Sequence, residues 1–406
     1  MVVSDESFLQ SKYNLKSRIF KDKTNLKFDF WVNRDEQVRK WKEVIENALE
    51  GHFNSLNFIV GDYGMGKTFS LLRIRNDFKK RDDVFQTYLS LVSETKYKGG
   101  LDFIFRLFKS IDFNQASTNK PSDLIAQALS KIPNKLTFHT ARNVLSQVLL
   151  GTSQSVDTSL FGDLPKHVVS SSDLGYRFLC GETLNSKEQK KLQISSKKID
   201  DLDDAKKYLA SWLIVMRGLG YKAILILVDE FEYLFSLVNS TEQQKYMALL
   251  RSLHDLSDET GIMQDEMANL IFFFATSNDG WKLFDVSEER SRGIKPGPLS
   301  ALKRRLGDVT VLEPFDKEKT KELIEIRMKY DRVRKKFEDK PLIPYTEDFV
   351  DFIYELTNGN PHLVLTRCDH VMDAGLSERI ETLDARFAES VLKARGFYYT
   401  KGENAS

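Results

Sequence analysis

Continuous apolar runs and segments of helical periodicity alternate along most of the chain. Three apolar runs, at residues 56–60, 223–228 and 269–275, have the length of strands. A strand without polar alternation is typical of a parallel sheet that is covered on both faces. Residues 84–92 and 308–312 are rich in β-branched or aromatic side chains and give two more predicted strands. The pattern predicts an α/β fold with a parallel sheet of five strands.

Helical periodicity fills the intervals between these runs. In the first half of the chain it covers residues 38–49, 68–80, 101–111, 121–132, 140–150 and 203–218. Connections between parallel strands are normally short, so the largely helical stretch at about 95–200 is predicted to be an insertion. Beyond the fifth strand the period is helical only, with segments that begin near Lys317, Thr346, Pro361 and Thr382.

This pattern predicts four parts of the chain. Residues 1–30 are polar and mixed, and they are predicted to form an N-terminal arm. Residues 31–315 contain all five predicted strands and the insertion. Residues 316–396 are predicted to be a small all-α domain, and residues 397–406 a tail.

Bulk composition narrows the function classes. The formal net charge is +1, so no global basic field indicates nucleic acid, and any such binding must use a local patch. Cys180 and Cys368 lie far apart and fit no metal spacing, which favours a reducing, cytoplasmic compartment. We expect no signal peptide and no membrane partner, because no apolar run is long enough to span a bilayer.

The strongest chemical signal lies directly after the first predicted strand. Residues 61–68 fit the phosphate-loop pattern G-x-x-x-x-G-K-[ST], between a strand and a helix. The glycines let successive N–H groups point at one phosphate. Lys67 is expected to reach the β and γ phosphates of a nucleoside triphosphate, and the Thr68 hydroxyl to bind Mg²⁺. An accidental glycine-rich turn, the alternative, does not account for this context. The predicted ATP-binding residues are Gly61, Asp62, Tyr63, Gly64, Met65, Gly66, Lys67, Thr68 and Phe69.

Two adjacent carboxylates end the third predicted strand. Asp229 is expected to hold Mg²⁺, directly or through water, and Glu230 to orient and polarise the attacking water. The alternative is a strand end with two solvated acids. The phosphate loop favours the catalytic interpretation, because the two motifs together describe a hydrolysis site.

Polar residues also follow the fourth predicted strand and precede the fifth. Thr276 or Asn278 is expected to position the water, and the alternative is an ordinary turn, where such residues are common. Arg304 and Arg305 are predicted to lie on a helix. They suit an arginine finger, which projects its charge onto the γ phosphate bound by a neighbouring subunit. The alternative for them is a solvent-facing basic helix end.

Together these motifs resemble the AAA+ ATPases of the origin-recognition and initiator type. The resemblance covers roughly residues 30–396, although the insertion is not standard for the family. Residues 176–182 and 218–232 look like the ATP-binding proteins of BREX-type phage-defence systems. The features that match the initiators are Asn33-Arg34-Asp35-Glu36, the phosphate loop, Asp229-Glu230, Thr276, Arg304 with Arg305, and the helical domain from Pro314-Phe315 to Gly359-Asn360-Pro361.

The resemblance implies an ASCE-type P-loop NTPase with strand order 5-1-4-3-2, a C-terminal helical lid, and ATP bound at a subunit interface. It makes Glu230 the catalytic base, Thr276 or Asn278 the first sensor, and Arg304 or Arg305 the finger. Two features depart from the family. The lid reads Gly359-Asn360-Pro361-His362 where initiators place a sensor arginine. With only about ten residues after the lid, we expect none of the winged-helix DNA-binding domain that initiators carry there. Arg367 does not replace that sensor, because it lies about 140° round the helix from His362.

The leading functional hypothesis is an AAA+ ATPase that works as a nucleotide-driven assembly switch. It would form a homo-oligomer, or a hetero-oligomer with other AAA+ subunits, and act on DNA-linked protein partners in phage defence. The alternative is a nucleotide-gated signalling or scaffold protein with slow hydrolysis, whose insertion recruits a protein. A small-molecule kinase shares the phosphate loop, but the adjacent Asp-Glu pair suits water activation better. Direct contact with DNA is left open by the sequence.

Overall fold

Two compact units make up the chain. The computed structural model describes residues 5–16, 32, 34–51, 53–91, 100–117, 120–151, 171–233, 240–282, 302, 304–330, 332–333 and 340–397. The lid unit comprises residues 1–39, 61–69 and 311–406, and the sheet unit comprises residues 40–60 and 70–310. The phosphate loop is therefore grouped with the C-terminal helices. Asn33 and residues 398–406 of the expected tail lie outside the described residues.

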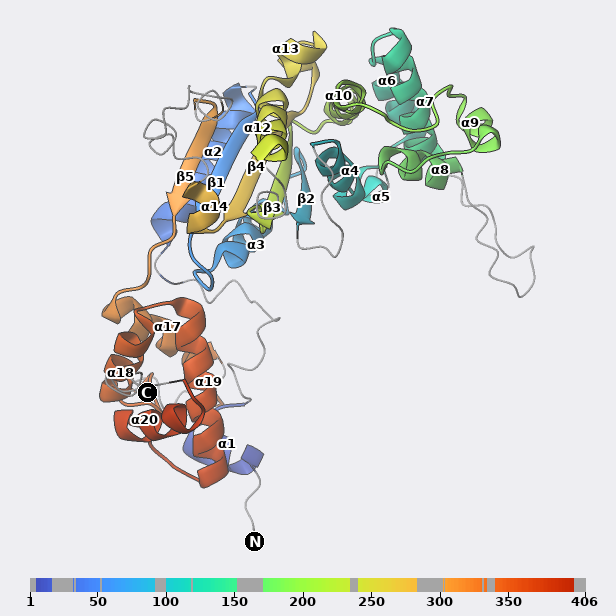
Figure 1. Ribbon diagram of the computed structural model, residues 1–406. Helices are drawn as coiled ribbons and strands as arrows, with labels where there is room; N and C mark the ends of the chain where they lie inside the picture. The colour runs from blue at the N-terminus through green and yellow to red at the C-terminus, as the bar shows by residue number, and fades with distance from the viewer. Residues whose placement is uncertain are drawn as a thin grey trace, which may run out of the picture. The chain divides into compact units, whose positions relative to one another are not determined.

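A five-stranded sheet forms the centre of the sheet unit (Figure 1). Its order is β2-β3-β4-β1-β5, which is the expected 5-1-4-3-2 read from the other edge. The pairings of β1 with β4, β4 with β3 and β3 with β2 are all parallel. The strands are β1 Ser55–Val60, β2 Val84–Ser90, β3 Ala223–Asp229, β4 Asn269–Thr276 and β5 Leu306–Val311.

Three of these strands are buried along their whole length, namely β1, β3 and β4. Covered strands in a parallel sheet gain from apolar side chains on both faces, which explains their unbroken hydrophobic sequences. The edge strands β2 and β5 contain half-buried and exposed positions. The fold class predicted from the sequence is confirmed.

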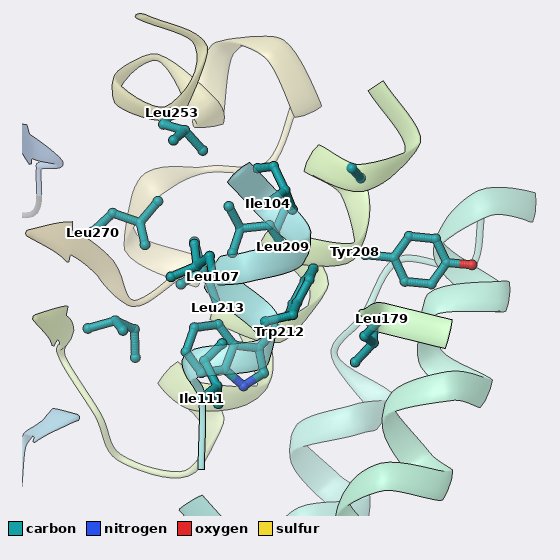
Figure 2. Packing of buried hydrophobic residues seen from close by; sticks show 14 of the residues in the cluster. Ile104, Leu107, Ile111, Leu179, Tyr208, Leu209, Trp212, Leu213, Leu253 and Leu270 are labelled. Atoms are coloured by element: carbon teal, nitrogen blue, oxygen red, sulfur yellow. The ribbon is translucent and has the colours of Figure 1, made fainter. Parts of the chain in front are cut away.

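The insertion between β2 and β3 is helical and shares one hydrophobic core with the sheet. Trp212 of α10, Leu107 of α4 and Leu270 of β4 belong to a single buried cluster (Figure 2). Helix α10 packs against α4, α6 and α7, and nearly all of its residues from Ala205 onward are buried. The helices of this region are α4 Gly100–Ser110, α5 Phe113–Ser117, α6 Ser122–Ser130, α7 Leu136–Gly151, α8 Ser171–Leu179, α9 Ser186–Leu192 and α10 Leu202–Gly218.

Further helices complete the sheet unit. Trp41 of α2 is buried, and its indole N–H donates to the Thr310 hydroxyl of β5 at 2.9 Å. None of the described helices is both long and apolar enough to cross a membrane. These elements are α2 Asp35–Gly51, α3 Lys67–Phe78, α12 Ser240–His254, α13 Leu256–Thr260, a 3₁₀ turn Gln264–Glu266 and α14 Asn278–Lys282.

The described residues of the lid unit form a second hydrophobic core, to which five described helices contribute. Helix α20 begins at Ala385, later than the predicted start at Thr382, because Asp384 caps it by accepting from the Phe387 N–H at 2.8 Å. The helices are α1 Asp5–Lys12, α17 Lys317–Tyr330, α18 Glu347–Thr357, α19 Pro361–Glu378 and α20 Ala385–Ala394.

The N-terminal segment is part of that lid core. Residues 5–16, which the sequence places in a polar arm, form α1 and a following turn against α19. Their apolar side chains are buried, and the Tyr13 hydroxyl donates to the carbonyl of Ile380 at 2.5 Å. Arg332 in turn donates to the Tyr13 carbonyl at 2.7 Å. The buried apolar residues of this segment are Phe8, Leu9, Tyr13 and Leu15.

Candidate nucleotide-binding site

The phosphate loop begins at Gly61, directly after β1, and runs into the first turn of α3 at Lys67. Gly64 and Gly66 have φ of 83° and 89°, in the left-handed region that glycine adopts without a steric cost. The Lys67 ammonium donates to the carbonyl oxygens of Gly61 at 2.8 Å and Asp62 at 3.3 Å. The Lys67 ammonium is thus held by backbone carbonyl groups of the phosphate loop itself.

The remaining predicted loop residues differ in exposure. Tyr63 and Thr68 are exposed, Phe69 is half-buried, and Met65 is buried. Thr68, in the first turn of α3, is therefore a residue that a hydrated cation can approach from solvent.

The start of α19 lies on this loop, within the lid unit. Asn360 caps α19 by accepting from the N–H groups of His362 at 3.1 Å and Leu363 at 3.2 Å. The same side chain donates to the Tyr63 carbonyl at 2.8 Å, and the His362 N–H donates to the Gly64 carbonyl at 3.2 Å. A Cβ at Gly64 would lie 2.6 Å from both Asn360 Oδ1 and His362 Cβ. Glycine is needed there for close approach as well as for its φ.

Asn360 and His362 were not among the residues that the sequence predicted for the site. In the sequence, the lid stretch Gly359-Asn360-Pro361-His362 is distinctive only because it lacks the sensor arginine of the initiators. In the structure the His362 ring also meets the Tyr63 ring edge-on, with centroids 5.3 Å apart. Arg367 is engaged elsewhere, since its guanidinium lies 4.1 Å from the centre of the Phe397 ring.

Arg34 is a further residue of the lid unit beside the loop. Its side chain lies over the Phe315 ring at 5.3 Å, and a Cβ on Gly66 would lie 3.7 Å from its Nη1. Only 6% of the residue is exposed, and Nη2 has no hydrogen-bond partner among the described residues. Burial lowers the pKa of Arg34 to about 10. The guanidinium therefore stays charged at neutral pH, beside the second left-handed glycine.

In the sheet unit, two carboxylates stand at the end of β3. Asp229 is buried, and its Oδ1 accepts from the backbone N–H of Glu230 at 3.0 Å. Its Oδ2 accepts from the Tyr88 hydroxyl of β2 at 2.6 Å. Burial, and then the hydrogen bond to the Asp229 carboxylate, raise the pKa of Tyr88 well above its usual range. Tyr88 is thus a neutral hydroxyl donor to the carboxylate, and the sequence analysis did not single it out.

Glu230 occupies a left-handed backbone conformation, with φ of 57°. A side chain other than glycine, asparagine or aspartate rarely adopts it, and the cost is about 1 kcal/mol. The next residue, Phe231, donates its N–H to the Ala275 carbonyl of β4 at 2.9 Å. The sharp turn at Glu230 therefore ends β3, and the chain continues beside the end of β4.

The two predicted sensor residues are not equivalent. Thr276 is fully buried, and its hydroxyl has no partner among the described residues. A Cβ on Gly280 of α14 would lie 2.4 Å from that hydroxyl, so the helix covers it closely. Asn278 begins α14 just beyond β4 and is half-buried. The geometry therefore gives Asn278 the better access to a ligand.

The two predicted finger residues also differ. Arg305 donates from Nε to both carboxylate oxygens of Asp255, at 2.8 and 2.7 Å, and this pairing raises the pKa of Arg305. Arg304 is exposed. Both lie in a turn directly before β5, and most of the helix expected around them falls outside the described residues. Arg305 is paired within its own unit, so Arg304 is the remaining candidate for an arginine finger that contacts a nucleotide bound by a partner subunit.

The donor groups suit Mg²⁺. Thr68 offers a hydroxyl oxygen and Asp229 a carboxylate, and oxygen ligands are those that Mg²⁺ prefers. Among the described residues no group of three or more His, Cys, Asp or Glu could hold a metal ion. A hydroxyl and a carboxylate are enough protein ligands for Mg²⁺, which is usually held by one or two side chains together with substrate phosphates.

Comparison with known proteins places one part of the chain in context. Residues 170–330 match the model of a family described as BREX system ATP-binding protein BrxC/D. These residues contain β3, β4 and β5, with Asp229, Glu230, Asn278 and Arg304. The match bears out, over that region, the similarity to BREX proteins that the sequence indicated. No curated protein matches the chain.

Several solved structures are similar at low identity. The Cdc6p protein of Pyrobaculum aerophilum has 12% identity and a TM-score of 0.44, over 97% of this chain and 72% of that one. The ORC2 protein of Aeropyrum pernix in its ADP form has 12% identity and a TM-score of 0.48, over 93% and 73%. The RuvB branch migration motor of Thermotoga maritima has 10% identity and a TM-score of 0.38, over 93% and 73%.

Proposed function

We propose that this chain binds and hydrolyses ATP as an ATPase of the AAA+ type. The proposal rests on the carboxyl ends of two strands of the sheet, β1 and β3. The phosphate loop follows directly on β1, Asp229 is the last residue of β3, and β4 alone separates these two strands. Parallel strands end at the same edge of a sheet, where α/β folds bind their ligands.

The chain's own groups divide the work of phosphoryl transfer to water. Backbone N–H groups of the loop and the start of α3 bind the phosphates, and Lys67 reaches the β and γ phosphates. Glu230 accepts the proton of the attacking water, and Asn278 orients that water. Thr68 and Asp229 would hold Mg²⁺, which would supply neutralisation of the phosphate charge.

The site is proposed to be completed by a second subunit. Arg304 is exposed and free of the Asp255 pairing that holds Arg305, so it is the arginine offered to a neighbour. An added positive charge at the γ phosphate stabilises the charge of the transition state. The oligomer is a homo-oligomer or includes other AAA+ subunits, and ATP drives its assembly.

The family match supports a role in phage defence, in which the assembly acts on DNA-linked protein partners. The alternative is a scaffold with slow hydrolysis that recruits a protein through its insertion. DNA-stimulated turnover favours the first function, and protein-stimulated or negligible turnover favours the second. Both share the ATP-binding step, so the primary experiment addresses binding and assembly.

The experiment compares wild type, Glu230→Gln and Lys67→Ala by size-exclusion with light scattering, with ATP and with or without duplex DNA. We expect an ATP-dependent oligomer that is trapped by Glu230→Gln and abolished by Lys67→Ala. ATP turnover should fall on the order of 100-fold or more in Glu230→Gln. A monomer under every condition would refute the interfacial site, and equal turnover in wild type and Glu230→Gln would remove Glu230 from its role.

A further inference from the structure

Tyr88 contacts the proposed catalytic carboxylates from a neighbouring strand. Its hydroxyl donates to Asp229 Oδ2 at 2.6 Å, across the parallel pairing of β2 with β3. In that pairing Tyr88 stands opposite Leu227, and Ser90 stands opposite Asp229. The Tyr88 side chain therefore reaches along the strand to the carboxylate two positions further on.

The Asp229 carboxylate also makes a hydrogen bond to Glu230. Its other oxygen, Oδ1, accepts from the Glu230 N–H at 3.0 Å. Glu230 is the residue with the left-handed φ of 57°, a conformation that persists only where its surroundings hold it. A continuous chain of two hydrogen bonds thus runs from the Tyr88 hydroxyl through Asp229 to the Glu230 backbone.

We propose that Tyr88 is a positioning residue for ATP hydrolysis. It fixes the carboxylate of Asp229 in one orientation, and through Asp229 it holds the strained turn that aims Glu230. A carboxylate held by a hydroxyl donor and a backbone donor cannot rotate freely about its χ2 angle, so the Mg²⁺ ligand and the general base keep their relative placement. The catalytic part of this inference rests on the proposed ATPase function, but the hydrogen-bond relay does not.

The test is Tyr88→Phe, which removes one oxygen atom and keeps the ring in the strand. The matched control is Tyr176→Phe, because the Tyr176 hydroxyl donates to the Lys109 carbonyl at 3.2 Å in the same unit, away from β3. The first readout is amide hydrogen exchange without nucleotide. We expect the Glu230 N–H to exchange about tenfold faster in Tyr88→Phe, since a hydrogen bond to a charged group is lost from its support.

Phe231 provides an internal reference for that measurement. Its N–H is bonded to the Ala275 carbonyl, so its exchange should be unchanged in both variants. General loosening of the sheet edge would instead accelerate Glu230 and Phe231 together. That result, or unchanged exchange at Glu230 in Tyr88→Phe, would overturn the relay whether or not the chain hydrolyses ATP.

The second readout is steady-state ATP turnover across a Mg²⁺ titration. Tyr88→Phe should lower kcat about tenfold, leave KM for ATP within about twofold, and raise the Mg²⁺ concentration needed for half-maximal rate. Tyr176→Phe should match wild type in all three. A wild-type kcat with an unchanged Mg²⁺ requirement in Tyr88→Phe would refute the positioning role. If wild type neither binds nor hydrolyses ATP, the proposed function fails, and the exchange result still decides the relay.

Discussion

Asn360 gives a sharp test of whether the lid holds the phosphate loop. Its side chain makes two separable kinds of contact: Oδ1 caps α19, and Nδ2 donates to the Tyr63 carbonyl. Asn360→Ala removes both. Asn360→Ser keeps a capping oxygen but is too short to reach the loop, so the pair of variants separates capping from the loop contact.

The magnitudes follow from these contacts. Loss of an N-cap costs about 1 kcal/mol, and loss of a partly exposed neutral hydrogen bond costs about 0.5–1.5 kcal/mol. Asn360→Ala should therefore cost about 2 kcal/mol and Asn360→Ser about 1 kcal/mol. The His362 N–H bond to the Gly64 carbonyl remains in both variants, because it uses only backbone atoms. At 1.4 kcal/mol per factor of ten, 1 kcal/mol corresponds to about fivefold in an opening equilibrium.

Amide exchange read by mass spectrometry suits this design, since it reports the loop and α19 separately. In Asn360→Ser, amides of residues 63–67 should exchange about fivefold faster while the first turn of α19 is unchanged. In Asn360→Ala, both segments should exchange faster. If loop exchange is the same as wild type in both variants, the lid does not hold the loop and the reasoning from Asn360 is refuted.

Two further predictions address the subunit interface and pH. Arg304→Ala should lower ATP turnover on the order of 100-fold at protein concentrations that saturate assembly. Arg305→Ala should keep wild-type turnover and lower the free energy of unfolding by at most about 1 kcal/mol, because the ion pair with Asp255 is lost. A loss of turnover confined to Arg305→Ala would exchange the roles of the two arginines. Burial and the charge of Arg395 lower the pKa of His370 below its ordinary value of 6.5. Between the lowered pKa and 6.5 the unfolded chain binds a proton that the folded chain does not, so the melting temperature should rise with pH in that window and this slope should shrink in His370→Gln.

The strands were predictable because burial on both faces leaves an unbroken apolar sequence. Residues 223–228 and 269–275 appear as β3 and β4, and the phosphate loop is recognisable from local spacing alone. The order of the strands came from the resemblance to initiator ATPases, not from periodicity. Helix starts were less certain: Asp384, not Thr382, supplies the cap of α20.

The missed site residues act over long distances in sequence. Nothing near Tyr88 in the sequence indicates Asp229, 141 positions away. Asn360 reaches Tyr63 across 297 positions. The sequence does not distinguish Arg305 from Arg304, and only the structure shows that Arg305 is paired with Asp255. Such contacts depend on the packing of whole elements, and a single sequence carries no local signal of them.

The placement of α1 has a consequence for the order in which this protein can be completed. Residues 5–16 are made more than 300 residues before the helices that cover Phe8, Leu9 and Tyr13. During synthesis these side chains therefore remain exposed to solvent while the residues of the sheet unit are made. Burying each one fully is worth about 1.5–3 kcal/mol, so the lid core closes only after its C-terminal helices have been made, and it joins segments that are far apart in the sequence. Removal of residues 5–16 would take away part of a hydrophobic core, not a dispensable extension.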